Sequence, residues 1–233
     1  MTEQLRTLLL QTDRTNPAMD RLLEDYARYH LVFAVLGAAM LAALGALAVH
    51  CVRRFRRAPR VGGSSFERRS YASVAIASGA VFLVLGLVVV GNFGNALSPA
   101  HGFAGAVHAI PTAHPGTPRA ALHDAFTDWL QAGAAATPSL VQDRIDDRLA
   151  WQRPKAFLSA LALVGVVVLA RRLWRRLVES SRQRASGTRR SRADRARLTL
   201  AVALGPVALV LAAMVLGNTQ ASMAPITMTL VFG

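Results

Sequence analysis

The chain has few of the residues from which enzyme and redox sites are usually built. Cys51 is its only cysteine, so no disulfide can form within the chain. Motifs that hold a catalytic serine or a nucleotide phosphate are also missing: there is no Gly-x-Ser-x-Gly sequence, Walker loop or Rossmann glycine pattern. These absences favour a protein without catalytic activity and leave the question of an enzyme open.

Charged residues are scarce in four long apolar stretches. A helix needs roughly 20 apolar residues to cross a bilayer, because each residue adds about 1.5 Å. We expect four such spans, at residues 31–52, 71–90, 155–174 and 198–217. The third has the shortest uncharged part, residues 156–170, and its helix is expected to continue past Arg171. Since ionisable residues inside a membrane usually mark ion and proton pathways, their absence argues against a proton-coupled pump or a voltage sensor.

The net charge of +14 comes from two arginine-rich segments that lie between predicted spans. Residues 53–69 contain seven arginines and one acid, and residues 171–197 contain eleven arginines and two acids. Cytoplasmic loops of membrane proteins carry an excess of Lys and Arg, so we expect both segments in the cytoplasm and both chain termini outside. We also expect contact with anionic lipid headgroups and no nucleic-acid binding, because few aromatic side chains accompany the arginines. The arginines expected at the headgroups are Arg53, Arg54, Arg56, Arg57, Arg171, Arg172, Arg175 and Arg176.

The composition also indicates which membrane the protein occupies. One lysine stands against 26 arginines and alanine is abundant, which is typical of proteins from GC-rich bacterial genomes. Residues 1–30 carry five acids and four arginines, unlike the short positive region of a cleaved signal. We therefore expect a multi-pass protein of a bacterial cytoplasmic membrane.

The order of features indicates a tandem duplication of one helical hairpin. Asn16-Pro17 and Thr137-Pro138 are each typical of a helix start, and each is followed by an Asp-Arg pair. In both copies one span then ends in an arginine cluster and the next ends in Gly-Asn. We predict an all-α integral membrane protein whose four transmembrane helices form two tandem parallel hairpin repeats. The predicted parts are a first hairpin at residues 1–99, a linker at 100–136 and a second hairpin at 137–233.

The segment between the hairpins is expected to combine an irregular stretch with one short helix. Residues 93–118 are rich in Gly, Ala, His and Pro and should be irregular. Leu122, Phe126, Trp129 and Leu130 then recur at helical spacing. This pattern predicts an amphipathic helix that lies on the membrane or packs against the protein.

Histidines and paired acids are the candidate chemical groups of the chain. Histidine with nearby carboxylates suits Zn²⁺ or Cu²⁺. The four candidate ligands are His101, His108, His114 and His123. Their spacings of seven, six and nine residues match no compact ligand motif, so solvated side chains are the alternative. The pairs Glu24-Asp25 and Asp146-Asp147 could serve acid–base chemistry, but we expect solvated helix faces paired with neighbouring arginines.

Small residues recur every four positions on the first and fourth predicted spans, a spacing that lets helices approach closely. The positions are Ala38, Ala42 and Ala46 on the first span, and Ala201, Gly205, Ala213 and Gly217 on the fourth. They could join the chain's own spans or bind another subunit. Pro206 should kink the fourth span.

The last residues have a pattern of their own. The stretch from Asn218 to Gly233 has no charge, and from Ile226 onward its residues follow a two-residue period. Such a tail could add as a strand to a partner's sheet, or it could lie along the protein's own surface, which is the default expectation.

Three functions are compatible with this sequence. The first is a small membrane subunit that scaffolds, stabilises or assembles a larger complex with other subunits or a second copy of the chain. The second is a transporter or channel for small solutes or lipids, with Ser73, Ser78, Asn92 and Ser159 along its path. The third is an envelope enzyme or sensor that uses the four histidines and a metal. No cofactor is expected beyond the Zn²⁺ or Cu²⁺ of this third hypothesis.

Overall fold

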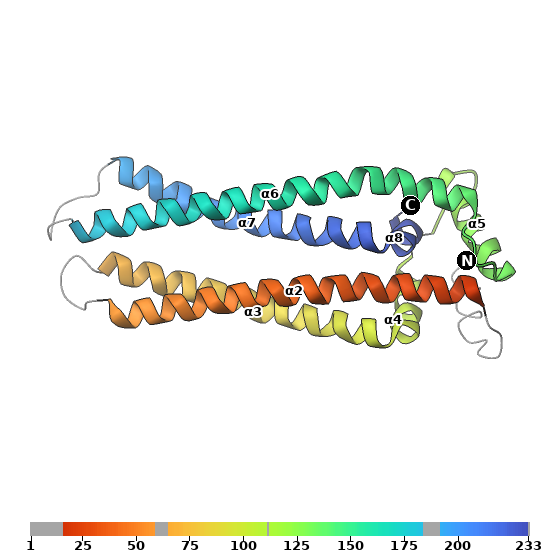
Figure 1. Ribbon diagram of the computed structural model, residues 1–233, viewed down its shortest axis with the longest axis horizontal. Helices are drawn as coiled ribbons and strands as arrows, with labels where there is room; N and C mark the ends of the chain where they lie inside the picture. Colours follow the sequence, from red (N-terminus) through yellow and green to blue (C-terminus); the bar gives the residue numbers. More distant parts are fainter. Residues whose placement is uncertain (1–15, 59–64, 111, 184–191, 233) are drawn as a thin grey trace. The chain divides into compact units, whose positions relative to one another are not determined.

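The computed structural model describes residues 16–58, 65–110, 112–183 and 192–232, and all regular elements in these ranges are helical. The long helices are α2 (Pro17–Arg57), α3 (Ser65–Leu97), α6 (Ser139–Gln183) and α7 (Arg192–Met223) (Figure 1). The short ones are α4 (Pro99–Ala106), the 3-10 turn η1 (Val107–Ala109), α5 (Pro118–Ala132) and α8 (Pro225–Phe232). The predicted all-α class is confirmed.

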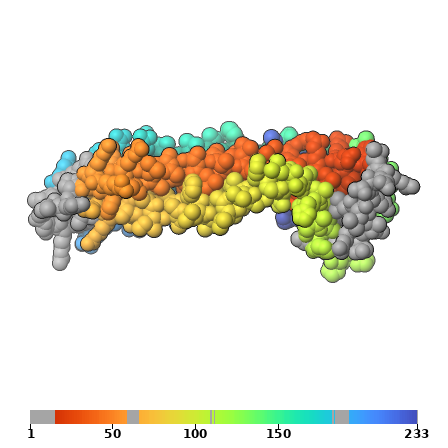
Figure 2. Space-filling view, turned by 90° about the horizontal axis from the view of Figure 1, so that it is seen from below, coloured from red at the N-terminus to blue at the C-terminus, as the bar shows by residue number. Residues whose placement is uncertain are grey.

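Each long helix is long and apolar enough to cross a membrane. α2 packs with α3 as one hairpin and α6 packs with α7 as another, and α2 and α3 lie side by side in both views (Figure 1, Figure 2). Large apolar side chains point outward from these helices: Ile76, Leu83 and Leu87 are 73%, 68% and 78% exposed. Exposed apolar surface of this kind suits lipid better than water. The four candidate spans indicate a multi-pass membrane protein.

Two of the long helices exceed what a membrane requires. α2 has 41 residues and α6 has 45, so each is about 60–70 Å long against a hydrocarbon layer of about 30 Å. The continuation of α6 past Arg171 is confirmed, since this helix ends at Gln183. In both helices the residues that precede the apolar stretch belong to the first of two compact units.

The chain divides into two compact units. Unit 1 comprises Met1–Leu36, Val89–Ala156 and Leu216–Gly233, and unit 2 comprises Gly37–Val88 and Phe157–Val215. Unit 1 therefore holds the N-terminal parts of α2 and α6 with α4, α5 and α8. Unit 2 holds the apolar middles of the four long helices together with the arginine-rich ends of α2 and α6 and the starts of α3 and α7.

Unit 1 has a hydrophobic core to which both hairpins contribute. Leu22 of α2, Phe126 of α5, Val141 of α6 and Leu230 of α8 are fully buried there, and Phe103 of α4 is 1% exposed. Burying each such side chain stabilises the fold by roughly 1.5–3 kcal/mol. The N-terminal parts of α2 and α6 are thus fixed to each other through the short helices.

The predicted start of α2 is confirmed at Asn16. Its side-chain oxygen accepts a hydrogen bond from the Met19 amide at 3.0 Å, and its amide nitrogen donates to the Leu130 carbonyl at 2.8 Å. Asn16 therefore caps α2 and also joins it to α5. α6 begins at Ser139, one residue later than the Thr137-Pro138 signal predicts.

The amphipathic helix predicted in the linker is confirmed as α5. Its apolar stripe, Leu122, Phe126, Trp129 and Leu130, is buried in the core of unit 1, so the helix packs against the protein. The Thr117 hydroxyl caps its start by accepting from the Ala120 amide at 3.2 Å.

The prediction that residues 93–118 are irregular is wrong for most of that segment. α3 continues to Leu97, Pro99 opens α4, and η1 follows to Ala109. Proline is well placed in the first turn of α4, where a backbone N–H has no partner within the helix. These residue types were expected to break helices, but Pro99 and Pro118 begin α4 and α5, and Gly94, Gly102 and Gly105 lie inside α3 and α4.

The strand alternative for the tail is wrong, because residues 225–232 form α8, a helix packed against the chain's own core. A two-residue period indicates a strand when one face is solvated and the other is not. In α8 the polar Thr227 and Thr229 are as buried as Ile226 and Leu230. A helix surrounded by protein on all sides needs no polar face, so the alternation carried no information about solvent.

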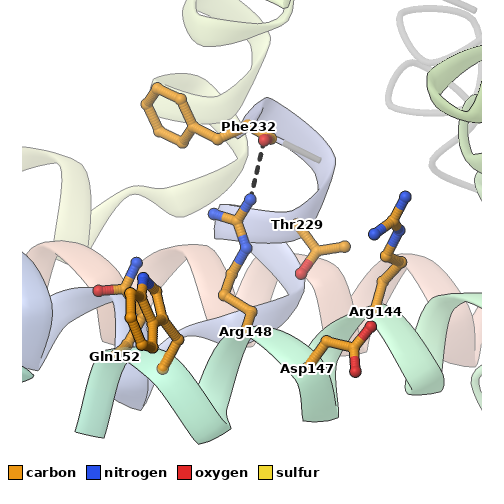
Figure 3. A pocket seen from close by; sticks show the side chains of 7 residues that line it. Arg144, Asp147, Arg148, Gln152, Thr229 and Phe232 are labelled. Carbon is orange, nitrogen blue, oxygen red and sulfur yellow. Dashed lines mark hydrogen bonds between the residues drawn. The ribbon is translucent and has the colours of Figure 1, made fainter. Parts of the chain in front are cut away.

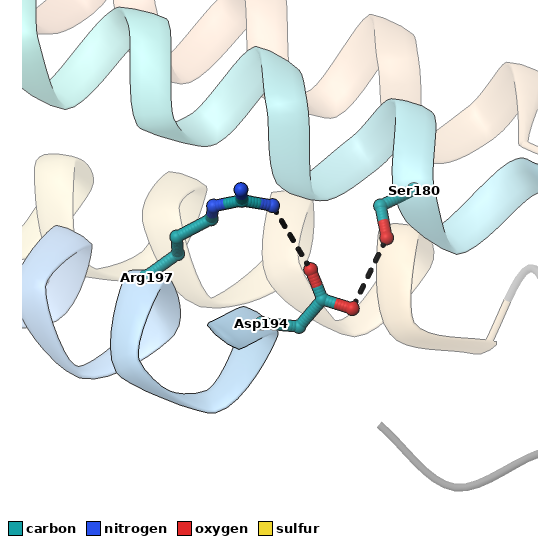
Figure 4. A network of polar contacts seen from close by, with 3 residues as sticks. All are labelled: Ser180, Asp194 and Arg197. Carbon is teal, nitrogen blue, oxygen red and sulfur yellow. Dashed lines mark hydrogen bonds and ion pairs between the residues drawn. The ribbon is translucent and has the colours of Figure 1, made fainter. Parts of the chain in front are cut away.

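Unit 2 contains buried acids at the start of α3 and α7. Asp194, in the first turn of α7, is 6% exposed, accepts from the Ser180 hydroxyl at 3.2 Å and pairs with Arg197 at 3.3 Å (Figure 4). Glu67, in the first turn of α3, is 4% exposed. A carboxylate in a helix's first turn is favoured by the helix dipole. These acids of the arginine-rich segments therefore contribute to folding, and Asp194 joins α7 to α6.

Candidate functional site

Three side chains from other helices form hydrogen bonds with the backbone of α8. At its N-terminus, the Asp25 carboxylate of α2 accepts a hydrogen bond from the Thr227 amide at 2.7 Å. The residue before α8, Ala224, has no side chain able to cap it, so Asp25 replaces a local cap. Burial raises the pKa of Asp25, and hydrogen bonds from the Thr227 and Ile226 amides oppose that rise.

Asp25 is therefore not the solvated acid that the sequence suggests. It is 5% exposed and acts as a cap for a helix some 200 residues away in the chain. Its neighbour Glu24 does follow the expectation, because it is exposed and pairs with Arg28 at 2.7 Å. Asp146 and Asp147 of the second acidic pair are both exposed.

Two arginines hold the other end of α8. Arg119 of α5 donates to the Val231 carbonyl at 2.8 Å, and Arg148 of α6 donates to the Phe232 carbonyl at 2.8 Å. Cations near the C-terminus of a helix offset its negative partial charge and bond carbonyls that have no partner within the helix. We call Asp25, Arg119 and Arg148 the α8 clasp. Through it, three other helices fix both ends of α8.

An open pocket of about 400 Å³ lies beside this clasp, between α6 and α8 (Figure 3). We call it the α6–α8 pocket; it is lined by Arg144, Asp147, Arg148, Trp151, Gln152, Thr229 and Phe232. Thr229 is fully buried, and its hydroxyl has no hydrogen-bond partner within the described part of the chain. Burial and the positive charge of Arg144 lower the pKa of Arg148. The pocket thus combines two arginines, an unpartnered hydroxyl and exposed aromatic rings.

A second polar group joins α2 to α3 and α7. His30 Nδ1 lies 2.8 Å from the Asn92 side-chain oxygen, and the Gln220 side chain donates to the Tyr29 carbonyl at 3.1 Å. Tyr26 packs edge-on against the Phe103 ring, with centroids 5.3 Å apart. These contacts fix helix ends against one another.

The four candidate metal ligands are separated by their environments. His101, His108 and His114 are exposed, whereas His123 is 5% exposed and buried beside α8. Among the described residues no group of three or more His, Cys, Asp or Glu side chains is placed to hold a metal ion. Burial, with a smaller effect of the Arg119 charge, lowers the pKa of His123. The geometry of the described ranges gives the metal hypothesis no support.

The small-residue positions lie mostly on the outer surface of the helices. Ala38, Ala42 and Ala46 are all exposed, and Gly205, Ala213 and Gly217 are exposed too, while Ala201 is half-buried. The close approach inside the first hairpin uses a different glycine: a Cβ on Gly45 would lie 3.4 Å from the Phe82 ring. The alanine ladder of the first span therefore faces away from the rest of its own chain.

The arginines expected at lipid headgroups are exposed without exception. One contact orders their surroundings: the Arg68 guanidinium lies 4.6 Å from the centre of the Phe55 ring. Headgroup binding by these clusters stays a prediction.

Comparisons with protein-family models, with curated proteins and with solved structures found no match to this chain. The site must therefore be understood from its own residues. Sequence reasoning noted Asp25 only as part of an acidic pair and missed Arg119 and Arg148, because each of the three acts on a carbonyl or amide more than 80 residues away. Only the polar character of Arg119 and Arg148 within amphipathic helices could have indicated them.

Proposed function

We propose that the chain is a small polytopic subunit that scaffolds or assembles a larger complex in a bacterial cytoplasmic membrane. The supporting observation is the exposed ladder of Ala38, Ala42 and Ala46 on α2. Helices in lipid associate through close packing, since lipid tails are as apolar as leucine, and small residues four apart allow that approach. A ladder used within the chain would be buried in it; this one is available to a helix of another subunit.

The proposal includes an orientation. The arginine-rich ends of α2 and α6 would face the cytoplasm, and the starts of the same two helices would face the opposite side of the membrane. The eight exposed arginines at the ends of two helices support this arrangement. Unit 1 would then be the part of the subunit that faces the cell envelope.

The proposal also includes an origin by duplication. If Asp20-Arg21 is aligned with Asp143-Arg144, Leu22 corresponds to Ile145, and both are buried in the core of unit 1. The same alignment matches Asp25 with Arg148, the residues that hold the opposite ends of α8. In each copy the second long helix is followed by an eight-residue helix that begins with proline, α4 or α8.

Association can be tested by native electrophoresis and native mass spectrometry of the tagged protein in mild detergent. We expect the wild-type chain to carry a second polypeptide in fixed ratio, and Ala42→Leu to lose it because the larger side chain blocks close approach. Ala80→Leu is the matched control, since Ala80 is equally exposed on α3 and belongs to no ladder. A wild-type chain found only as a monomer or homodimer in several detergents would contradict the proposal.

Transport is a second candidate, favoured by one observation. Ser78 and Ser159, two of the polar residues expected along a path, are 6% and 5% exposed inside unit 2. Solute flux in proteoliposomes, lost in Ser78→Leu and Ser159→Leu and kept in Ser73→Leu, would support transport, because Ser73 is exposed. No flux across a broad panel of solutes would count against it.

A further inference from the structure

The α6–α8 pocket begins at the level expected for the membrane–water interface and extends away from the apolar layer along α6. On α6, Gln152 and Arg148 come four and eight residues before Ala156, where the uncharged stretch begins. These positions are about 6 and 12 Å beyond the apolar layer, and Arg144, twelve residues before Ala156, is about 18 Å beyond it. Each headgroup layer is roughly 5–8 Å deep, so Gln152 lies at headgroup level and the two arginines lie beyond it. Trp151 is 66% exposed, with the Lys155 ammonium 4.6 Å from the centre of its ring. An exposed tryptophan with a lysine beside it at this level is typical of an interfacial belt.

The charges that line the pocket are unbalanced. Arg144 and Arg148 face it with one carboxylate, Asp147. Arg148 donates one N–H to the Phe232 carbonyl. The other N–H groups of its planar guanidinium remain available to a ligand. Within the described ranges Arg144 forms no ion pair or hydrogen bond. Because the charge of Arg144 and burial both disfavour the charged form of Arg148, an anion between the two guanidinium groups would be bound favourably.

Thr229 adds a hydroxyl to these donors. It lies on α8 between the two arginines in the close view (Figure 3). Buried hydroxyls usually have a hydrogen-bond partner, whereas that of Thr229 has none among the described residues. Two guanidinium groups and a hydroxyl form a donor set suited to the oxygens of a phosphate group.

We propose that the α6–α8 pocket binds a phosphate group, carried by the headgroup of an anionic phospholipid or by a soluble phosphate. Arg144 and Arg148 bond the phosphate oxygens, and the exposed rings of Trp151 and Phe232 contact the apolar part of the ligand. This site is separate from the exposed arginine clusters at the other ends of α2 and α6. It goes beyond the subunit proposal and does not depend on any protein partner.

The lipid arm of the test uses the full chain in nanodiscs containing phosphatidylglycerol with a photoreactive headgroup. After irradiation, mass spectrometry maps the labelled peptides, which separates the pocket from the arginine clusters. We expect label on the peptides that contain residues 144–152 or 225–232, and a fall of about tenfold in Arg144→Gln, as for the loss of one charged hydrogen bond. Arg144 is suitable because it holds no other part of unit 1. Arg153→Gln, which removes an equal charge from an exposed position outside this pocket, should keep the label.

The soluble arm titrates inorganic phosphate and glycerol 3-phosphate into lipid-free protein in detergent by calorimetry. Binding that Arg144→Gln abolishes and Arg153→Gln retains, without lipid label at the pocket, would identify a soluble phosphate as the ligand. Thr229→Val should weaken whichever ligand binds by several-fold while α8 stays folded. The proposal is overturned if phosphate does not bind and lipid label is confined to the arginine clusters, or if Arg144→Gln changes neither readout.

Discussion

At the scale of single residues, buried charges fix the ends of helices. The Asp25 carboxylate accepts a hydrogen bond from the Thr227 amide of α8 at 2.7 Å. The Asp194 carboxylate accepts one from the Ser180 hydroxyl of α6 at 3.2 Å. A buried carboxylate is costly unless its oxygens accept hydrogen bonds, and both of these do. Such groups stabilise the native packing only as long as every partner remains in place.

Removing the carboxylate of Asp25 should loosen α8. Asp25→Ala leaves the Thr227 amide buried without an acceptor, and we expect the free energy of unfolding to fall by about 1–3 kcal/mol. Denaturant titration in detergent measures this loss, and hydrogen exchange should show it first in residues 225–232. Glu24→Ala, an exposed neighbour whose ion pair with Arg28 is solvated, should change stability by less than about 0.5 kcal/mol. Equal effects of the two substitutions would show that Asp25 does not cap α8.

His123 should make unit 1 sensitive to acid. Burial lowers its pKa in the folded chain below the ordinary value of 6.5. As the pH falls through 6.5, His123 becomes protonated in the unfolded chain but stays neutral in the folded chain. The free energy of unfolding therefore decreases until the pH reaches the lowered pKa of the folded chain. Above 6.5 both states are neutral and the full stability is present. Thermal unfolding between pH 7.5 and 5 should show this slope, weakened in His123→Gln and unchanged in the exposed control His101→Gln; an unchanged slope in His123→Gln would contradict the account.

At the scale of elements, the short helices depend on close packing against the long ones. α4 contains two glycines in contrasting surroundings: a Cβ at Gly102 would lie 2.9 Å from the Asn95 side-chain oxygen and 3.1 Å from the Tyr26 hydroxyl. A Cβ at Gly105 would meet nothing within 4 Å. α4 therefore approaches its neighbours at one glycine only.

The two glycines should respond oppositely to alanine. Gly105→Ala gains helix propensity and should raise the free energy of unfolding by up to about 1 kcal/mol. In Gly102→Ala the same gain in helix propensity is outweighed by steric overlap with Asn95 and Tyr26. The free energy of unfolding should therefore fall by about 1 kcal/mol. The free energies of unfolding of the two variants, measured under the same conditions, test this difference. If Gly102→Ala is as stable as Gly105→Ala, the packing of α4 against α2 and α3 is not as described.

Elements differed in how far the sequence revealed them. The long helices were predictable because an apolar length is a local property, as was α5, whose stripe Leu122, Phe126 and Trp129 has helical spacing. α4 and α8 were missed because their helical form depends on neighbours, such as the α8 clasp, that are remote in sequence. The pocket was missed for the same reason: Arg144 on α6 and Thr229 on α8 carry no shared pattern.

At the scale of the whole molecule, the chain combines four candidate spans with a packed unit built from both hairpins. The spans carry exposed apolar side chains and an exposed alanine ladder, which support a subunit embedded among other helices. Unit 1 carries the clasp and the pocket, and its core draws on α2, α4, α5, α6 and α8. In the proposed orientation the starts of α2 and α6 face outside and their arginine-rich ends face the cytoplasm.

Cysteine labelling in intact cells tests that arrangement most directly. Starting from Cys51→Ala, single cysteines are placed at exposed positions by Asp124→Cys in unit 1, and by Arg57→Cys and Glu179→Cys near the arginine clusters. We predict that a membrane-impermeant maleimide labels Asp124→Cys in intact cells, and labels the other two only after the membrane is permeabilised. Labelling of Arg57→Cys and Glu179→Cys from opposite sides, or of all three from the same side, would contradict the four-span topology.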